Sequence, residues 1–317
     1  MKKLYISSNE KDISMRELYN EFRKSREYLN VTEKTIKHYD NCFKQFSNFY
    51  DINLRCSEFN QEVISEYVFY LKKKGTVNEI TINAYITAVR ALAYFGMERG
   101  YIKGFSIKLI RAGKKIKETY TKEELCILLK KPDIKKCGFA EYRTWVITNY
   151  LLATGNRLST LAELKLGDIN FKDGEITMRK TKNRKQQIIP LSQELSKILR
   201  EYLTYRKGEA EESLFCTVYG GKLSTGTIQS EIRRYNHKRG ILKTSIHAYR
   251  HTFAKNWILN GGDIFTLQKI LGHSSIEMVK NYVNLYSDEL KIGFNSYNPL
   301  DRMMKDSGKG EHIKMTK

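Results

Sequence analysis

The sequence predicts a mainly α-helical protein with a small antiparallel β-sheet, arranged as an N-terminal helical bundle followed by an α+β domain. Apolar and aromatic residues in the first hundred positions recur at the spacing of one helix face. The period changes to two between residues 168 and 190, and helical spacing resumes from about residue 192. A chain of 317 residues can form two domains, each with its own core.

The first hundred residues predict four helices with apolar faces that form a core. The first begins with a capping box, in which Ser14 and Glu17 would satisfy each other's backbone N–H groups. Thr32 and Asn60 are suited to cap the second and third helices, and Gly75 to end the third. The fourth helix runs to about residue 99.

From Thr121, which with Glu124 forms a second capping box, helices alternate with short strands. Asp173-Gly174 favours a tight hairpin turn, and the basic segment 182–185 a second one. The helices are expected near 122–131, 140–154, 158–165, 192–206, 225–238, 247–260, 264–270 and 275–285, and the strands at 168–171, 175–178 and 187–189.

These patterns suggest four segments: a bundle over 10–108, a basic linker over 109–120, the α+β domain over 121–300 and a polar tail over 301–317. The linker is either simply solvated or passes along a nucleic-acid backbone, and both can hold.

The charge balance points to a polyanionic partner. Lys and Arg number 56 against 35 Asp and Glu, a formal net charge of +21, which favours nucleic acid over a ribosome or an anionic membrane surface. No apolar run is long enough to span a bilayer, and the N-terminus turns polar at Ser7, so we expect a cytoplasmic protein without membrane partners. Five scattered cysteines predict neither a disulfide framework nor a metal site, and no cofactor is expected.

The last third of the chain contains a set of residues suited to holding a scissile phosphate. His247 and Arg250 share a helix face at i, i+3 spacing, and Leu271-Gly272-His273 precedes Tyr282 by nine residues from the histidine. Guanidinium forks match the non-bridging oxygens of a phosphoryl group, histidines move protons near neutral pH, and a tyrosine oxygen can attack phosphorus. Arg157 and Lys182 supply further positive charge.

This set resembles that of the tyrosine recombinases, also called the phage integrase family, over about residues 10–295. The resemblance implies an N-terminal DNA-binding bundle and a tyrosine-recombinase catalytic domain. It implies site-specific DNA cleavage and rejoining through a 3′-phosphotyrosyl link, without metal or ATP. In that chemistry Tyr282 is the nucleophile, Arg157, His247, Arg250 and His273 surround the phosphate, and Lys182 protonates the leaving 5′ oxygen.

Some assignments have rivals. Tyr286 lies one helical turn after Tyr282, and Lys180, Arg184 and Lys185 compete with Lys182. Lys182 is favoured because the family places its lysine eight residues before a proline, here Pro190.

Two residues depart from the family pattern. Thr160 stands where an acidic residue often holds the first arginine, so either Glu163 or another group orients Arg157, or Arg157 is held more loosely. Tyr249 replaces the usual leucine before the second arginine.

The resemblance also implies partners: double-stranded DNA with short inverted-repeat core sites, and a homotetramer on DNA, alone or with a related recombinase. Because about thirteen residues precede Ser14, we expect a compact, Xer-like enzyme or mobile-element integrase without an arm-binding domain. The alternatives are a type IB topoisomerase-like enzyme and a catalytically inert DNA-binding protein on the same scaffold.

Overall fold

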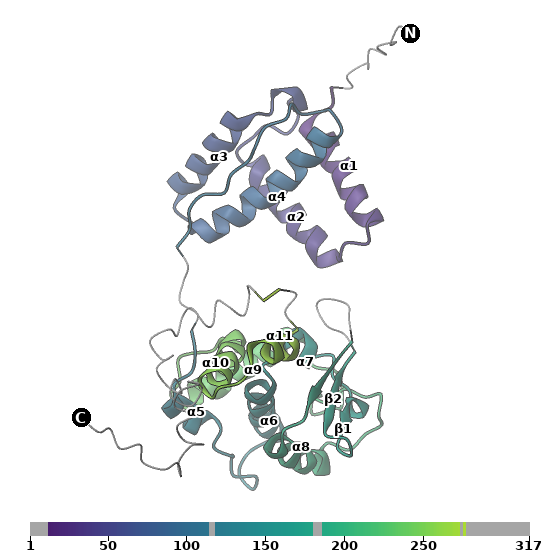
Figure 1. The fold of residues 1–317 in the computed structure, drawn as a ribbon, viewed down its shortest axis with the longest axis vertical. Helices are drawn as coiled ribbons and strands as arrows, with labels where there is room; N and C mark the ends of the chain where they lie inside the picture. The colour runs from purple at the N-terminus through teal and green to yellow at the C-terminus, as the bar shows by residue number, and fades with distance from the viewer. Residues whose placement is uncertain (1–11, 114–117, 180–185, 273–274, 277–317) are drawn as a thin grey trace, which may run out of the picture. The chain divides into compact units, whose positions relative to one another are not determined.

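The computed structural model describes residues 12–113, 118–179, 186–272 and 275–276. The chain divides into two compact units, Met1–Lys115 and Ile116–Lys317 (Figure 1). The described residues are mainly helical with one three-stranded antiparallel sheet, which confirms the predicted fold class.

The first unit is a bundle in which α4 packs against the other three helices. Its caps follow the sequence: Ser14 and Glu17 form the capping box, Thr32 and Asn60 cap the next two helices, and Gly75 ends the third in a left-handed conformation. Buried aromatic residues such as Phe46 fill the interior. The helices are α1 (Met15–Tyr28), α2 (Glu33–Ser47), α3 (Gln61–Lys74) and α4 (Glu79–Glu98), with a short 3-10 helix at Cys56–Glu58.

The second unit is built around α6, which packs against α8, α9 and α10 (Figure 1). A mostly buried helix has apolar residues on all sides, and Tyr142, Val146, Tyr150 and Leu151 are all at most 3% exposed. The helices are α5 (Lys122–Leu128), α6 (Phe139–Thr154), α7 (Leu158–Leu161), α8 (Gln193–Tyr205), α9 (Thr225–Lys238), α10 (Ile246–Leu259) and α11 (Ile264–Leu271), with a 3-10 turn at Leu166–Asp168.

The sheet has the order β1-β2-β3, with β1 at Ile169–Asn170, β2 at Glu175–Met178 and β3 at Gln187–Pro190. Gly174 adopts φ +68° in the turn between β1 and β2, as Asp-Gly predicts. The β2–β3 ladder ends at the pair Met178 and Gln187. The expected basic hairpin at 182–185 lies outside the described residues.

Helix α5 ends at Leu128, three residues earlier than expected, because of Pro132. The carbonyl of Leu128 would need an N–H from residue 132 to continue the helix, and proline has none. The Tyr235 hydroxyl donates to that carbonyl instead, at 2.8 Å, and the Trp145 indole donates to Leu129.

Helix α7 is also shorter than the expected 158–165. After Leu161 the chain turns and pairs with residues 210–214: Leu214 donates to the carbonyl of Leu164, and Leu166 to that of Glu212. Backbone pairing with a distant segment thus replaces the last turn of the helix. The helix expected over 275–285 lies outside the described residues, apart from 275 and 276, which form a bend and a turn.

Candidate active site

The loop between α6 and α7 carries Arg157 and is fixed by its own backbone. Gly155 ends α6 at φ +61° and donates to the carbonyl of Leu151. A side chain at Gly155 would meet the Phe253 ring at 2.6 Å and Leu271 at 2.8 Å, so only glycine fits there. Asn156 is buried and its amide donates to the Tyr150 hydroxyl at 2.7 Å. These contacts place Arg157 directly before the first residue of α7.

Arg250 is 5% exposed and bridges two segments of the second unit. Its guanidinium donates to the carbonyl of Gly155 at 2.9 Å and to that of Leu271 at 2.8 Å. Helix α10 begins at Ile246, so Arg250 is its fifth residue, although the spacing of the sequence predicts it within the first turn. The two carbonyl oxygens therefore hold the Arg250 guanidinium in place.

Arg157 and Arg250 meet at the same atom. Half-buried Arg157 donates to the carbonyl oxygen of Leu271 at 3.4 Å, the oxygen that also accepts from Arg250. Each guanidinium carries five N–H groups in a planar fork, a geometry that matches the oxygens of a phosphate. Two like charges held this close favour a bound anion, because it offsets their repulsion.

His247 joins the two arginines from the first turn of α10. Partial burial of the ring lowers its pKa from the ordinary value of 6.5, and the charges of Arg250 and Arg157 lower it further. Because the charges of both arginines act on the imidazole, the three side chains lie close enough to interact electrostatically. The structure thus brings together three of the six predicted site residues.

His251 also belongs to this neighbourhood, although its position directly after Arg250 predicts a side chain that points elsewhere. Its ring centroid lies 6.5 Å from that of His247, with the two rings 29° from parallel. Residues four apart share a helix face, so the i, i+4 spacing could have predicted this contact.

The other three predicted site residues, Lys182, His273 and Tyr282, lie outside the described residues, as do their rivals Lys180, Arg184, Lys185 and Tyr286. The described chain nevertheless leads to them. Gly272, with φ +60°, ends α11 directly before His273, and β3 begins at Gln187, two residues after the hairpin segment 182–185.

The two departures from the family pattern have local explanations. Glu163, one of the groups expected to orient Arg157, accepts a hydrogen bond from Lys222. The carbonyl of Leu271 accepts a hydrogen bond from Arg157 and so is one group that holds this arginine. Tyr249 is fully buried, lies 4.4 Å from the Tyr120 ring between centroids and donates to Asn236, so its larger side chain is part of the core.

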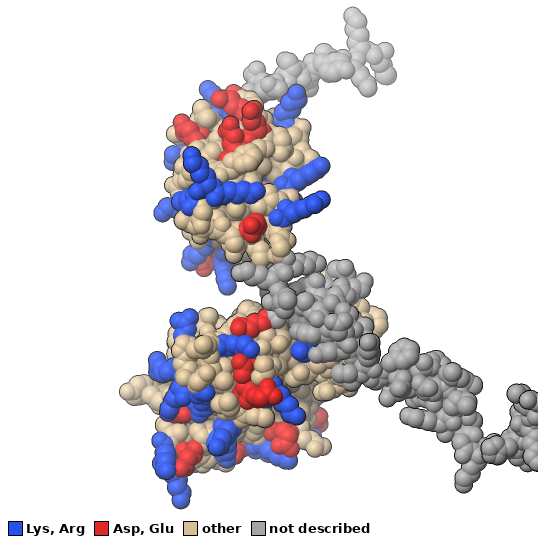
Figure 2. Space-filling model, turned by 90° about the vertical axis from the view of Figure 1, so that its left-hand side faces the viewer, with Lys and Arg blue, Asp and Glu red and all other residues tan. Residues whose placement is uncertain are grey.

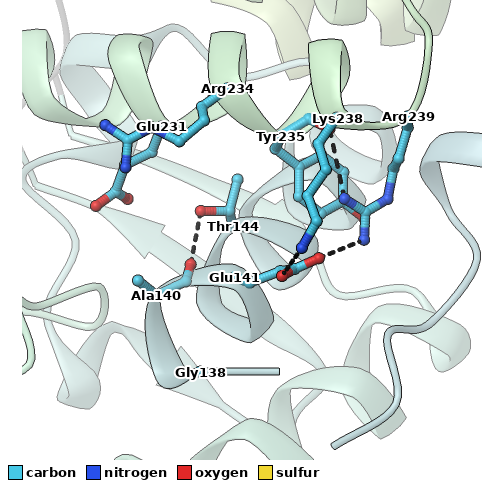
Figure 3. A pocket seen from close by; sticks show the side chains of 9 residues that line it. All are labelled: Gly138, Ala140, Glu141, Thr144, Glu231, Arg234, Tyr235, Lys238 and Arg239. Atoms are coloured by element: carbon cyan, nitrogen blue, oxygen red, sulfur yellow. Dashed lines mark hydrogen bonds and ion pairs between the residues drawn. The ribbon is translucent and has the colours of Figure 1, made fainter. Parts of the chain in front are cut away.

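A separate cavity of about 300 Å³ lies at the other end of α6 (Figure 3). There Glu141 accepts hydrogen bonds from Lys238 and Arg239. Because a 16-residue helix is about 24 Å long, this cavity is distinct from the arginine cluster at Gly155.

Figure 2 shows basic side chains scattered over the drawn face of each unit, and in the first unit acidic side chains gather toward one end. Within the described residues, no three His, Cys, Asp or Glu side chains are placed to hold a metal ion. In the same part of the chain, no helix has both the length and the apolar composition that crossing a bilayer requires.

Comparison with known proteins identifies the class of protein that this fold and cluster define. Residues 118–289 match the phage integrase family, and residues 8–111 match the phage integrase SAM-like domain. The chain therefore belongs to the phage integrase family. Its members are tyrosine recombinases, site-specific enzymes that work through a covalent intermediate between a tyrosine and DNA.

Individual relatives agree with this assignment. The chain is 26% identical to tyrosine recombinase XerD of Staphylococcus epidermidis over 291 residues, which are 86% of this chain and 97% of the relative. Among solved structures it is similar to the Tn1549 transposon integrase in complex with circular intermediate DNA (TM-score 0.70, 21% identity, 85% of this chain and 95% of that one). It is also similar to a lambda integrase tetramer bound to a Holliday junction (TM-score 0.69, 16% identity, 86% and 78%). These two structures share its fold.

Proposed function

We propose that this chain exchanges DNA strands at specific sites, with Arg157, His247 and Arg250 binding the scissile phosphate and Tyr282 attacking it. One observation carries the proposal: the two guanidinium groups share the Leu271 carbonyl, and both lower the pKa of the His247 imidazole. Such a cluster suits the negative charge that develops on non-bridging oxygens during phosphoryl transfer.

The chemistry is a pair of reversible transesterifications. The Tyr282 oxygen bonds to phosphorus while the bond from phosphorus to the 5′ oxygen breaks. The phenolic proton passes to a histidine, and Lys182 gives a proton to the leaving oxygen. A 5′-hydroxyl from a partner duplex then attacks the phosphotyrosine and frees the enzyme. The energy of the original phosphodiester is kept in the phosphotyrosine, so neither ATP nor a metal is required.

Chain connectivity supports a role for His273. It follows Leu271 by two residues, and covalent geometry limits the separation of their Cα atoms to about 7 Å. The arginine pair, which holds the Leu271 carbonyl, therefore also fixes the segment that leads to His273.

The proposed partner is double-stranded DNA with short inverted-repeat core sites, on which four protomers assemble, alone or with a related recombinase. The chain has 56 Lys and Arg residues against 35 Asp and Glu residues, and this excess of positive charge suits a DNA ligand. The tetrameric state has a precedent in the lambda integrase tetramer on a Holliday junction. Three biological settings fit such an enzyme: chromosome-dimer resolution, phage integration and transposon mobility.

A covalent-trapping experiment tests the proposal. An inverted-repeat duplex, selected by the protein from a randomised pool, carries a nick so that the fragment with the new 5′-hydroxyl diffuses away. We expect a denaturant-stable protein–DNA adduct that forms in EDTA and maps by mass spectrometry to Tyr282. Tyr282→Phe should abolish the adduct without weakening DNA binding, whereas Tyr286→Phe should keep it.

An adduct on another tyrosine, or one that persists in Tyr282→Phe, contradicts the assignment. Recombination between two such sites, measured beside relaxation of a supercoiled plasmid, separates a recombinase from a type IB topoisomerase.

A further inference from the structure

We propose that Gln187 is a positioning residue for the arginine pair: its amide fixes the last turn of α11, and with it the carbonyl that Arg157 and Arg250 share. This inference rests on the proposed function, because it concerns how the phosphate-binding arginines are held. Gln187 is the first residue of β3, in an element separate from those that carry the two arginines.

The side-chain amide of Gln187 donates hydrogen bonds to two backbone carbonyls at the end of α11. Its amide nitrogen donates to the carbonyl of Ile270 at 2.8 Å and also to that of Lys269. A side-chain amide has two N–H groups, so each carbonyl receives one. The last carbonyls of a helix lack partners within it, and here three in succession, at Lys269, Ile270 and Leu271, accept from side chains of three separate elements.

Gly272 allows this arrangement. A Cβ atom on Gly272 would lie 2.8 Å from the Gln187 side-chain oxygen and 3.9 Å from a terminal nitrogen of Arg157. The Gln187 amide and the Arg157 guanidinium thus both lie close to Gly272. Because Gln187 also pairs with Met178 at the end of the β2–β3 ladder, its side chain ties the sheet to the helix end beside the arginines.

Removing this tie should affect catalysis more than folding or binding. The Leu271 carbonyl would be free to shift, and both guanidinium groups would shift with it. Misplacement of catalytic groups by about 1 Å can cost on the order of a hundredfold in rate. The described hydrogen bonds of the Gln187 side chain go to backbone carbonyls of the protein. Its replacement should therefore change the affinity for DNA little.

The test compares adduct formation by Gln187→Ala and Gln187→Glu with that by the full-length wild-type chain. Gln187→Glu keeps the shape but lacks the donors. Gln186→Ala and Gln186→Glu are the matched controls, because Gln186 is exposed, adjacent in sequence and changes charge by the same amount. We expect both Gln187 variants to form the adduct about tenfold more slowly at saturating protein, with DNA dissociation constants within about twofold of their controls.

A second substrate separates positioning of the arginines from a general structural defect. A methylphosphonate at the cleavage position replaces one charged non-bridging oxygen with a methyl group, so there is less charge for the arginines to neutralise. The deficit of Gln187→Ala should then shrink to less than about threefold. Equal rates for the Gln187 and Gln186 variants on phosphate overturn the inference, and so does an equal deficit on both substrates.

If the wild-type chain does not cleave the methylphosphonate, the rates on phosphate decide alone. A melting temperature for each variant identifies any that fails to fold, and the remaining Gln187 variant then carries the comparison. Absence of a Tyr282-dependent adduct in the wild-type chain refutes the proposed function itself, whereas a normal wild-type adduct with unaffected Gln187 variants refutes only the role of Gln187.

Discussion

The environment of His247 changes the pKa of its imidazole. Burial of part of its ring and the charges of Arg250 and Arg157 all lower its pKa. In the absence of DNA the neutral imidazole is therefore favoured to a lower pH than in a free side chain. A bound phosphate would act in the opposite direction, because negative charge stabilises the imidazolium.

This shift predicts a pH dependence of stability. Between the lowered folded pKa and the ordinary value of 6.5, the unfolded chain binds more protons at this position than the folded chain. The free energy of unfolding therefore falls as the pH falls through that window. His247→Gln removes this contribution, so it should lose less stability than the wild type between pH 7.5 and pH 5.5 in urea denaturation. An equal loss in both proteins would contradict the prediction.

The sequence predicted that three candidate site residues lie together, but it did not predict the contacts of Gln187. Arg157, His247 and Arg250 stood out by residue type and spacing, and all three lie together. Gln187 had no such signal, because its partners are 82 and 83 residues away and are backbone groups that any sequence possesses. Glutamine in a short strand looks like an ordinary solvent-facing residue.

At the scale of elements, local chemistry predicted where helices begin better than where they end. Ser14, Thr32, Asn60 and Thr121 all cap as expected, because a cap involves residues within one turn. The end of α7 depends on pairing with residues 210–214, which local spacing does not reveal. The end of α5 could have been predicted from Pro132.

Two glycines that end helices allow a controlled prediction. Gly75 and Gly155 have nearly the same φ, +65° and +61°, but a side chain at Gly75 meets no atom within 4 Å, whereas one at Gly155 collides with Phe253 and Leu271. Gly75→Ala should therefore destabilise its unit by about 1–2 kcal/mol through backbone strain alone. Gly155→Ala should cost about 1–3 kcal/mol more from overpacking. Chemical denaturation measures both, and equal losses would exclude the steric contribution.

At the scale of the molecule, each unit has a hydrophobic core of its own. Phe46 lies in the core of the first unit and Leu199 in that of the second, and both are completely buried. Compact units with separate cores commonly unfold separately.

We therefore expect two unfolding transitions in scanning calorimetry. Phe46→Ala should lower only one of them, by about 3–5 kcal/mol of stability, and Leu199→Ala only the other, by about 2–5 kcal/mol. A single transition that moves with either substitution would mean that the two units unfold together.

The anchoring of Arg250 on the oxygens of Gly155 and Leu271 has an evolutionary consequence. Main-chain oxygens are present whatever amino acid occupies a position, so drift at residue 271 could exchange leucine for another apolar residue of similar volume without removing the acceptor. Selection would then act on the course of the polypeptide, through a permissive glycine and a well-filled interior. A saturation library at position 271, sorted for recombination, should accordingly recover several apolar residues.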